Sequence, residues 1–518
     1  MSRLTFFCDL AEATTPLPHF WEHTVGSDHA SMALRDDWQR DLKRAHVELG
    51  FRHVRFHGLL SDDMTQRRGD GATRRHGDKI SASPRLPISV SPPLPISVSP
   101  PRVFDFLLSI GMRPFVELSF TPAALASGKK TVFHYKANVT PPKNYKEWAR
   151  LIEQLVVHLV ERYGENEVRE WLFEVWNEPN LRAFWRGSQR DYFRLYRHTA
   201  EAIKTVSASF KVGGPATAKS AWIEDFVDYC ERNDVPADFV STHYYPNDGF
   251  ENDGGTEVQL FKSQRGIMRE VAQNTRAHAR GRPVYYTEWN TSSNPSDELH
   301  DESYAAAAIA STVMEANGLV EGYSFWTFSD IFEEHGLPTV PFHGGFGLLT
   351  LHGIPKPAYR TFELLHDLGE QQSLVDGLHE TVDCSVVQKE SSVTVLLTNH
   401  TTPGHSIETE EIHIRLTNAR EPIAARIRRV DPDHANPKRL WVEMGRPESL
   451  SQKDIDRLET ASALVSEKQG VEFQDGSVFL KTNLPAHGVA AITIDFNPQK
   501  LCLKSQDSDL GEVGTVTR

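Results

Sequence analysis

Two glutamates stand where strand-like runs end, in surroundings suited to acid–base chemistry. The run WLFEVWNEP carries Glu178 just before a proline that stops the strand, and the run PVYYTEWN carries Glu288 among aromatic residues. Cleavage of a glycosidic acetal needs a proton donor for the leaving oxygen and a nucleophile or base for the anomeric carbon, and two carboxyl groups of unequal pKa supply both. A lone glutamate in a cleft is more often solvated or salt-bridged than catalytic, but two at strand ends indicate glycoside hydrolysis.

The elements that carry these glutamates form a repeating pattern between residues 20 and 368. Short apolar, β-branched or aromatic runs alternate with amphipathic helical patterns such as NYKEWARLIEQLVVHLVERYG, which is typical of βα units around a parallel sheet. Eight runs are strand-like: FWEHTV, FRHVRFHG, RPFVELSF, WLFEVWNEP, KVGGPAT, DFVSTHYYP, PVYYTEWN and GYSFWTFSD. They predict an α/β fold, a (β/α)8 TIM barrel, in which working residues project from the carboxyl ends of the strands. Strands four and seven lie on opposite sides of such a ring, so Glu178 and Glu288 should face each other across its mouth.

The rest of the chain predicts a smaller accessory domain. After residue 368 the pattern changes to short alternating strands such as SVVQKESSVTVLLTNH, EEIHIRLTN and HGVAAITIDF, which predict a C-terminal β-sandwich over residues 369–503. Residues 1–19 include LTFFCD, which either adds a strand to that sandwich or stays unpaired. Residues 504–518 are polar and are expected to form a flexible tail.

The octapeptide LPISVSPP occurs twice in succession, at residues 86–93 and 94–101. Prolines at this density remove amide donors and forbid a helix, so residues 65–102 are expected to form an exposed insertion after the second strand. A proline-rich docking site is one interpretation. A tandem duplication or a local error in the gene sequence is the other.

Composition and charge argue against several classes of function. The net charge of −14 disfavours a polyanionic partner, so neither nucleic acid nor a membrane surface is expected. The four cysteines lack paired spacing and are interpreted as free thiols. No apolar stretch is long enough to span a membrane and the first residues do not resemble a signal peptide, so we expect a cytoplasmic location. Gly344, Gly345 and Gly347 do not follow a strand-turn-helix arrangement, and His-Glu-x-x-His is absent, so no cofactor and no catalytic metal are expected.

In its longer motifs the chain resembles retaining glycosidases of the barrel superfamily, whose acid/base follows an asparagine on strand four and whose nucleophile ends strand seven. It is similar in particular to the β-xylosidase branch of glycoside hydrolase family 39, through HTVGSDHA, LRDDWQRDLKRAHVELGFRHVRFHGLLSDDM, FDFLLSIGMRPFVELSFTP, WLFEVWNEPNL, STHYYP, YYTEWN and SFWTFSDIFEE. The resemblance implies that Glu178 is the general acid/base and that Glu288 forms the covalent glycosyl-enzyme. It also implies an exo-acting enzyme that releases xylose from the non-reducing ends of xylo-oligosaccharides; a homo-oligomeric state is left open.

Three further residues are expected beside the two glutamates. Asn177 resembles the family asparagine that bonds the sugar 2-hydroxyl, although an asparagine before Glu-Pro also suits a turn. His243 and Tyr245 share one face of strand six by the two-residue period. The resemblance assigns both to the floor of the site, where Tyr245 would bond the nucleophile and His243 would lie near the acid/base or the sugar. A buried histidine with a backbone partner is the alternative for His243.

Strand two contributes His57 and Arg55, which match similar positions of the family. Arg55 would favour the ionised form of Glu288 electrostatically. Alternatively, an arginine inside a barrel only neutralises a structural carboxylate such as Glu174.

Strand eight and its loop are expected to hold the sugar. The indole of Trp326 offers an apolar platform for the C–H face of a sugar. Glu333 and Glu334 resemble acidic residues that grip the outer hydroxyls of a terminal xylose, and otherwise form a solvated charge pair. Two other enzyme activities stay open on the same scaffold, of an α-L-iduronidase-like or an arabinosidase type, but these two glutamates would repel the carboxylate of a uronate. A catalytically silent sugar-binding barrel is the alternative from another class of protein.

Overall fold

The structure is a computed structural model that describes residues 4–64, 99–250, 252–334 and 336–497. Eight parallel strands close into a barrel, with the order β10-β11-β12-β3-β4-β5-β8-β9 around the ring. In chain order they are β3 (Thr24–His29), β4 (His53–His57), β5 (Arg113–Leu118), β8 (Leu172–Val175), β9 (Lys211–Thr217), β10 (Phe239–His243), β11 (Val284–Trp289) and β12 (Gly322–Phe325). The predicted TIM barrel is confirmed.

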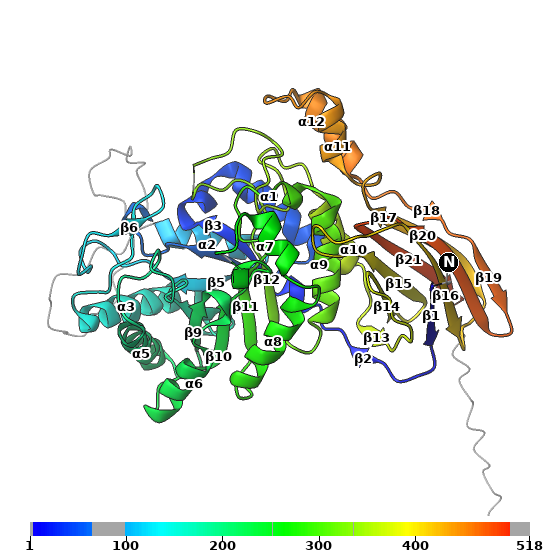
Figure 1. Cartoon of the computed structure of the whole chain (residues 1–518). Helices are drawn as coiled ribbons and strands as arrows, with labels where there is room; N and C mark the ends of the chain where they lie inside the picture. Colours follow the sequence, from blue (N-terminus) through cyan, green and yellow to red (C-terminus); the bar gives the residue numbers. More distant parts are fainter. Residues whose placement is uncertain (1–3, 65–98, 251, 335, 498–518) are drawn as a thin grey trace, which may run out of the picture.

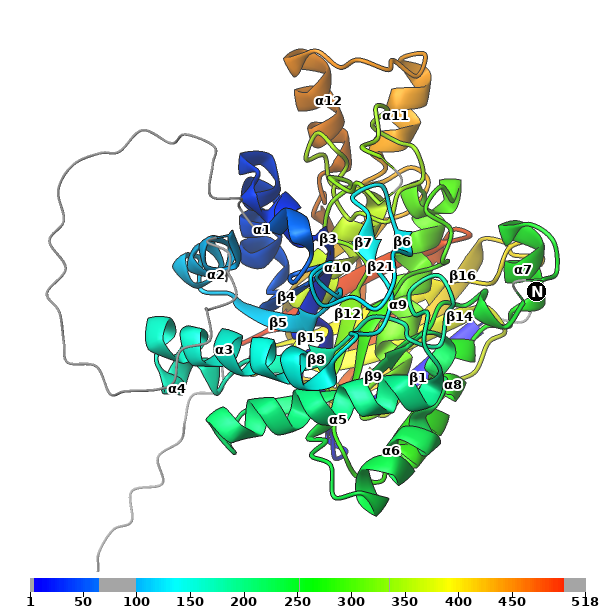
Figure 2. The ribbon, with the colours of Figure 1, turned by 90° about the vertical axis from the view of Figure 1, so that its left-hand side faces the viewer.

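Helices surround this barrel (Figures 1 and 2). They are α1 (Asp36–Leu49), α2 (Ser99–Ser109), α3 (Tyr145–Tyr163), α4 (Glu165–Val168), α5 (Gln189–Val206), α6 (Ile223–Arg232), α7 (Thr256–Lys262), α8 (Ile267–His278), α9 (Ser303–Glu315) and α10 (Pro357–His366). Helix α3 shows why such segments are helical. The side chain of Asn144 accepts hydrogen bonds from the first turn, apolar residues at three- and four-residue steps are buried, and the helix ends at Gly164.

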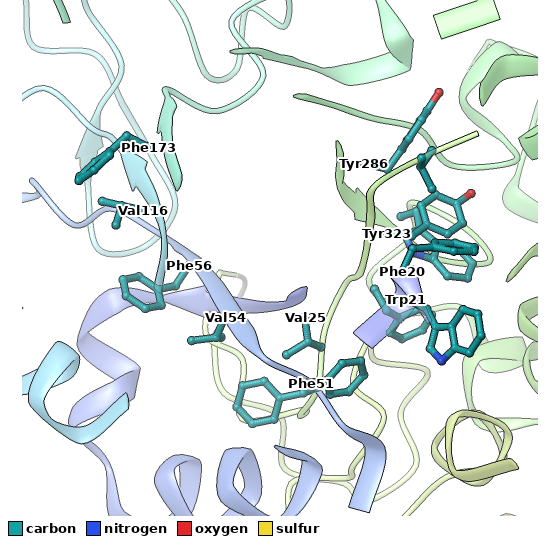
Figure 3. Close-up of a cluster of buried hydrophobic side chains, with 14 of the residues drawn as sticks. Phe20, Trp21, Val25, Phe51, Val54, Phe56, Val116, Phe173, Tyr286 and Tyr323 are labelled. Carbon is teal, nitrogen blue, oxygen red and sulfur yellow. The ribbon is translucent and has the colours of Figure 1, made fainter. Parts of the chain in front are cut away.

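The first barrel strand begins later than predicted. The run FWEHTV was expected to be that strand, but Phe20–Glu22 forms a short 3-10 turn and β3 starts at Thr24. Phe20 and Trp21 are both buried, and the ring of Phe20 packs against that of Tyr323 with centroids 6.2 Å apart (Figure 3). An apolar run that is buried in a turn has the same composition as a buried strand, so its composition was misleading.

The barrel interior changes from apolar to polar along the strands. Phe115, Leu172 and Phe239 form a small apolar cluster with Tyr285 inside the ring. Because strand side chains alternate, the positions two residues further along face the same side, and they are polar. These positions are Glu117 after Phe115, Glu174 after Leu172 and Thr287 after Tyr285. The apolar layer therefore supports a charged layer below the mouth of the barrel.

The C-terminal part forms two sheets, of which the larger packs against α9 and α10 through β15, β17 and β21 (Figure 1). One has the order β1-β16-β20-β19 and the other β18-β17-β21-β15-β14-β13-β2. Their strands are β1 (Leu4–Asp9), β2 (Thr15–Pro16), β13 (Gln371–Ser373), β14 (Val382–Gln388), β15 (Ser392–Asn399), β16 (Glu410–Thr417), β17 (Pro422–Val430), β18 (Glu467–Lys468), β19 (Val471–Gln474), β20 (Ser477–Leu484) and β21 (Gly488–Phe496). Strand β1 pairs in parallel with β16 and shares a buried apolar core with both sheets. The start of the chain thus contributes a strand to each sheet.

The C-terminal part also contains two helices that the sequence analysis missed. Helices α11 (Pro437–Glu443) and α12 (Gln452–Ser462) stand between β17 and β18, at the top of Figure 1. They pack with Phe342 and Ile354 of the barrel loops in a separate apolar cluster. The expectation of strands alone was wrong here, although the sequence carries helix signals: a proline follows Asn436, and Ser451 forms a capping box.

Most of the proline-rich insertion lies outside the described residues. Its expected end at residue 102 is wrong, because α2 already begins at Ser99. Pro100 and Pro101 fall in the first turn of this helix, where the missing amide hydrogens have no intrahelical partner to lose. The tail 504–518 and Cys502 also lie outside the described residues, whereas Cys8, Cys230 and Cys384 are free thiols. Among the described helices, none has the length and apolar character needed to cross a membrane.

Candidate active site

Glu178 and Glu288 meet at the carboxyl ends of the strands. Glu178 follows β8, and Glu288 lies at the end of β11. One carboxyl oxygen of each lies within 4.8 Å of the other and of a nitrogen of His243. Both glutamates line a cavity of about 610 Å³. The other expected site residues on its wall are His57, Asn177, Tyr245, Trp326 and Glu334.

The backbone at the end of β8 directs Glu178 into this cavity. Glu178 has a φ of 45° and Trp176 a φ of 75°, both in the left-handed region that non-glycine residues avoid. The amide of Glu178 donates to the carbonyl of Ala216 at 2.7 Å, which ties the end of β8 to β9. Such backbone strain is typical of functional positions. Burial raises the pKa of Glu178 to about 7, so this carboxyl is protonated up to neutral pH.

Glu288 lies in different surroundings, which favour its ionised form. Arg55 donates from Nη1 to Oε1 of Glu288 at 2.7 Å, and the hydroxyl of Tyr245 donates to Oε2 at 3.0 Å. Nε2 of His57 lies 3.5 Å from the same Oε1. A carboxylate that accepts hydrogen bonds from a cation and a hydroxyl is stabilised as an anion. The two glutamates therefore have unlike surroundings, because hydrogen-bond donors contact Glu288 whereas burial favours the protonated form of Glu178.

Arg55 connects this anion to the charged layer inside the barrel. Nε donates to Glu174 at 2.6 Å, and Nη2 lies 2.9 Å from Oε2 of Glu117 and 3.0 Å from Oδ1 of Asn177. Burial opposes the charge, but these carboxylates and Glu288 raise the pKa of Arg55 above its usual value. The two interpretations of Arg55 are thus not exclusive, because one guanidinium contacts both Glu174 and Glu288.

Glu117 was not singled out from the sequence, although it belongs to this network. It accepts from Nδ1 of His57 at 2.7 Å and from the Ser119 hydroxyl. Burial opposes its ionisation, but His57 and Arg55 lower the pKa of Glu117 overall. Its position on β5, two residues after the inward-facing Phe115, was the available signal.

Thr287 determines the direction of the hydrogen bonds around His243. The Thr287 hydroxyl donates its single proton to Oε1 of Glu174 at 2.7 Å. At the 3.2 Å contact between Thr287 and Nε2 of His243, the ring nitrogen must therefore be the donor. Burial lowers the pKa of His243 to about 4, so the ring is neutral near pH 7 and Nδ1 carries a lone pair.

The lone pair on Nδ1 of His243 determines which form of Glu178 it can bind. Nδ1 of His243 lies 3.0 Å from Oε1 of Glu178, and a lone pair accepts a hydrogen bond only from a protonated carboxyl. The chain of contacts from Glu174 through Thr287 and His243 therefore favours the protonated form of Glu178. A backbone partner for His243, the alternative considered from the sequence, is not among its hydrogen bonds in the described part of the chain.

Trp326 and Glu334 form the wall next to His57. The rings of Trp326 and His57 have centroids 4.8 Å apart, and Oε1 of Glu334 lies 3.5 Å from Nε2 of His57. Burial, together with neighbouring carboxylates, raises the pKa of Glu334 well above its usual value. A protonated carboxyl there both donates and accepts, as a sugar hydroxyl requires.

Glu333 is directed away from its neighbour. Oε1 of Glu333 lies 3.1 Å from Nδ1 of His29, and Oε2 lies 3.3 Å from Nε2 of His134. Glu333 is not part of the cavity lining, whereas Glu334 is. The structure therefore brings Glu334 to the site and engages Glu333 with histidines instead, so the two do not act as a pair.

Several lining residues come from loops and were missed. These are Phe133, His134, Phe184, Lys219, Asp248 and Phe346. Loop residues carry no periodic signal, and their position depends on how the loops fold over the barrel mouth. Phe133 and Phe184 have ring centroids 5.5 Å apart and form an aromatic rim.

Glu178, His243 and Glu288 also offer three atoms at metal-binding spacing. The cation of Arg55 is 2.7 Å from Glu288, the hydroxyl of Tyr245 donates to Glu288, and Nδ1 of His243 accepts from Glu178. This charge balance suits two carboxyl groups that act on a substrate better than it suits a bound cation.

A (β/α)8 barrel with two facing carboxyl groups in unlike surroundings at its mouth defines a barrel-type glycoside hydrolase. The comparisons with known proteins agree. The family model described as Glycosyl hydrolases family 39 matches residues 7–81 and 97–478, and its interruption contains the first copy of LPISVSPP and the first residues of the second. The chain belongs to glycoside hydrolase family 39, which is a retaining family.

Curated relatives and solved structures resemble nearly the whole chain. A beta-xylosidase of Caldicellulosiruptor saccharolyticus is 46% identical over 484 residues, which are 92% of this chain and 95% of that protein. A beta-xylosidase of Geobacillus stearothermophilus is 36% identical over 491 residues, 92% of each. The crystal structure of the GH39 enzyme from Xanthomonas axonopodis pv. citri has a TM-score of 0.80 and 30% identity, and the match covers 96% of this chain and 98% of that one.

Proposed function

We propose that the protein is an exo-acting β-xylosidase that releases xylose from the non-reducing ends of xylo-oligosaccharides with retention of configuration. The observation that carries the proposal is the pair Glu178 and Glu288, whose oxygens lie within 4.8 Å and of which one is buried with a raised pKa and the other bound by Arg55. Retaining glycosidases separate their carboxyl groups by about 5 to 5.5 Å, and inverting ones by about 6.5 to 9.5 Å. The names of the two curated relatives support the choice of xylose.

The first step of this reaction breaks the glycosidic bond. A carboxylate oxygen of Glu288 attacks the anomeric carbon, the bond to the leaving oxygen breaks, and Glu178 transfers its proton to that oxygen. The product is a glycosyl ester on Glu288. Arg55 and Tyr245 keep Glu288 ionised and oriented before the attack.

The second step releases the sugar. A water molecule attacks the anomeric carbon, Glu178, now a carboxylate, accepts its proton, and the ester bond to Glu288 breaks. Asn177 accepts from Arg55 through Oδ1, and its amide group, which donates to none of the residues that the structure describes, can donate to the sugar 2-hydroxyl. Such a bond strengthens as positive charge develops at the anomeric carbon.

Sugar selectivity is assigned to the wall formed by Trp326 and Glu334. Trp326 offers a flat face to the pyranose ring, and the protonated Glu334 pairs with outer hydroxyls. A uronate such as iduronate would need a cation at this wall. His57, which contacts both Trp326 and Glu334, is already paired with Glu117.

Substrate comparison tests the activity. Hydrolysis of p-nitrophenyl β-xyloside should exceed that of the α-arabinoside and iduronide analogues, and proton NMR should show β-xylose as the first product. A preference for the arabinoside or the iduronide would show that xylose is not the preferred sugar. No hydrolysis of any of the three would favour a sugar-binding barrel, and α-xylose as first product would exclude retention.

Two further proposals concern the setting of the enzyme. A cytoplasmic location is supported by the three described cysteines, which are unpaired as expected in a reducing compartment. The second proposal is that the chain forms a homo-oligomer, and the molar mass from light scattering tests it.

A further inference from the structure

A second cluster of ligand-type side chains lies away from the mouth of the barrel. His19, Glu22 and His366 each offer one atom, and these atoms lie within 4.8 Å of one another. Glu22 closes the turn before β3, and His366 is the last residue of α10. The cluster borders a cavity of about 730 Å³ that Glu370 and Glu390 also line.

The hydrogen-bond positions around His19 require a proton or a metal ion between His19 and Glu22. Nε2 of His19 lies 3.1 Å from the carbonyl oxygen of Gly369, which only accepts, so Nε2 carries a hydrogen. A neutral His19 would then point the lone pair of Nδ1 at Oε1 of Glu22, 2.8 Å away. Two acceptors at that distance repel each other unless a proton or a metal ion lies between them.

His366 completes the arrangement. Its Nδ1 lies 2.8 Å from the same Oε1 of Glu22, so two imidazole nitrogens approach one carboxylate. Metal-binding histidines generally donate their other ring N–H to a carbonyl or carboxylate, as His19 does to Gly369. Imidazole nitrogens with a carboxylate are a donor set that zinc accepts.

Gly50 leaves room for this cluster. A Cβ atom at Gly50 would lie 2.6 Å from Nδ1 of His366 and 2.8 Å from the carboxyl carbon of Glu22. Any larger residue would displace the two side chains. Gly50 has a φ of +74° as the C-cap of α1, so both space and conformation favour glycine there.

We propose that His19, Glu22 and His366 bind one zinc ion, through Nδ1 of each histidine and a carboxylate oxygen. Tetrahedral zinc with bonds of about 2.0 to 2.2 Å would hold its ligands about 3.4 Å apart, so the present 2.8 Å contacts need only open slightly. The open coordination position would face the cavity. The ion would connect the turn before the barrel, the end of α10 and the segment leading to β13 (Gln371–Ser373).

Zinc binding to the full chain, produced without a polyhistidine tag and stripped with a chelator, tests the proposal. Calorimetric titration with ZnCl₂ should give one site per chain, and the melting temperature should rise with zinc. His366→Ala should weaken binding at least about 100-fold, beyond the 10- to 100-fold typical of changes around a metal site. His413→Ala is the matched control, because His413 lies on β16 and pairs with Glu411 instead.

Two results would overturn the site. One is an absence of stoichiometric zinc uptake by the stripped protein, which would leave a proton between His19 and Glu22. The other is equal uptake by the wild type and His366→Ala. If that variant does not fold, X-ray absorption of the zinc-loaded wild type decides, since two imidazoles and one carboxylate are required. Xylosidase activity is not the readout, so failure here leaves the proposed function untouched.

Discussion

His243 contacts Glu178 through Nδ1 at 3.0 Å, and it can serve only as the acceptor in that hydrogen bond. The reason lies on the other side of the ring, where Thr287 accepts from Nε2. A residue next to the expected nucleophile thus influences the protonation of the expected acid. The roles of both glutamates can be tested through this relationship.

The pH dependence of the wild type should report Glu178. Burial raises the pKa of this carboxyl to about 7, and an acid catalyst works only while protonated. We therefore expect kcat/KM for an aryl xyloside with a poor leaving group to fall about tenfold per pH unit above pH 7. An activity that stays constant up to pH 9 would contradict the assignment.

Thr287→Val should shift that alkaline limb to lower pH. Without the hydroxyl, Nε2 of His243 loses its acceptor, and the ring prefers the tautomer whose Nδ1 donates to an ionised Glu178. A hydrogen bond to a charged group is worth about 1.5 to 3 kcal/mol, so the shift should be about one unit or more. Thr287→Ser keeps the hydroxyl and should keep the wild-type profile. A purely structural role would lower activity equally at all pH values in the valine variant.

Removal of each glutamate should give a different azide product. In Glu288→Ala, azide should enter from the α face and yield an α-xylosyl azide, because the nucleophile is missing. In Glu178→Ala, the first step should persist for substrates with good leaving groups, and azide should yield the β-xylosyl azide. If the two products are exchanged, the two roles are exchanged as well.

Tyr245→Phe should lower kcat/KM about 10- to 150-fold, from the loss of a hydroxyl that donates to Glu288 at 3.0 Å. The lost hydrogen bond orients the nucleophile rather than the bound sugar, so kcat should fall more than KM rises. Tyr244→Phe is a suitable control, because Tyr244 precedes it on the chain and is not among the residues that line the cavity. A similar loss in both variants would point to disturbed folding of the loop after β10.

The stability of Glu178→Gln offers an independent check of the buried carboxyl. The pKa of Glu178 is raised from its usual 4.5 to about 7 in the folded protein, so this carboxyl lowers the free energy of unfolding progressively as the pH rises from about 4.5 to about 7, and the full loss is present above pH 7. The variant should therefore gain melting temperature relative to the wild type at pH 8.5 and show less difference at pH 5.5. Equal differences at both pH values would show that the carboxyl is not shifted.

The sequence by itself determined the barrel and the pair at its mouth. Strand and helix periodicity is local, and residues at strand ends are brought together by the closed ring whatever the loops do, so Glu178, Glu288, His243 and Tyr245 could be placed in advance. An apolar run predicted a strand at Phe20 and Trp21, but these residues are buried in a turn instead. Local patterns were overlooked in α11 and α12, whose caps were present in the sequence.

Only the tertiary structure decided which polar groups pair. Arg55 contacts three carboxylates from different strands, Glu333 turns to His29 while Glu334 enters the cavity, and the proton on His243 depends on Thr287. Hydrogen bonds are directional and act over about 3 Å, so their partners follow from distances between elements far apart in the chain. Periodicity can tell which face a side chain shares, but not which atom it meets.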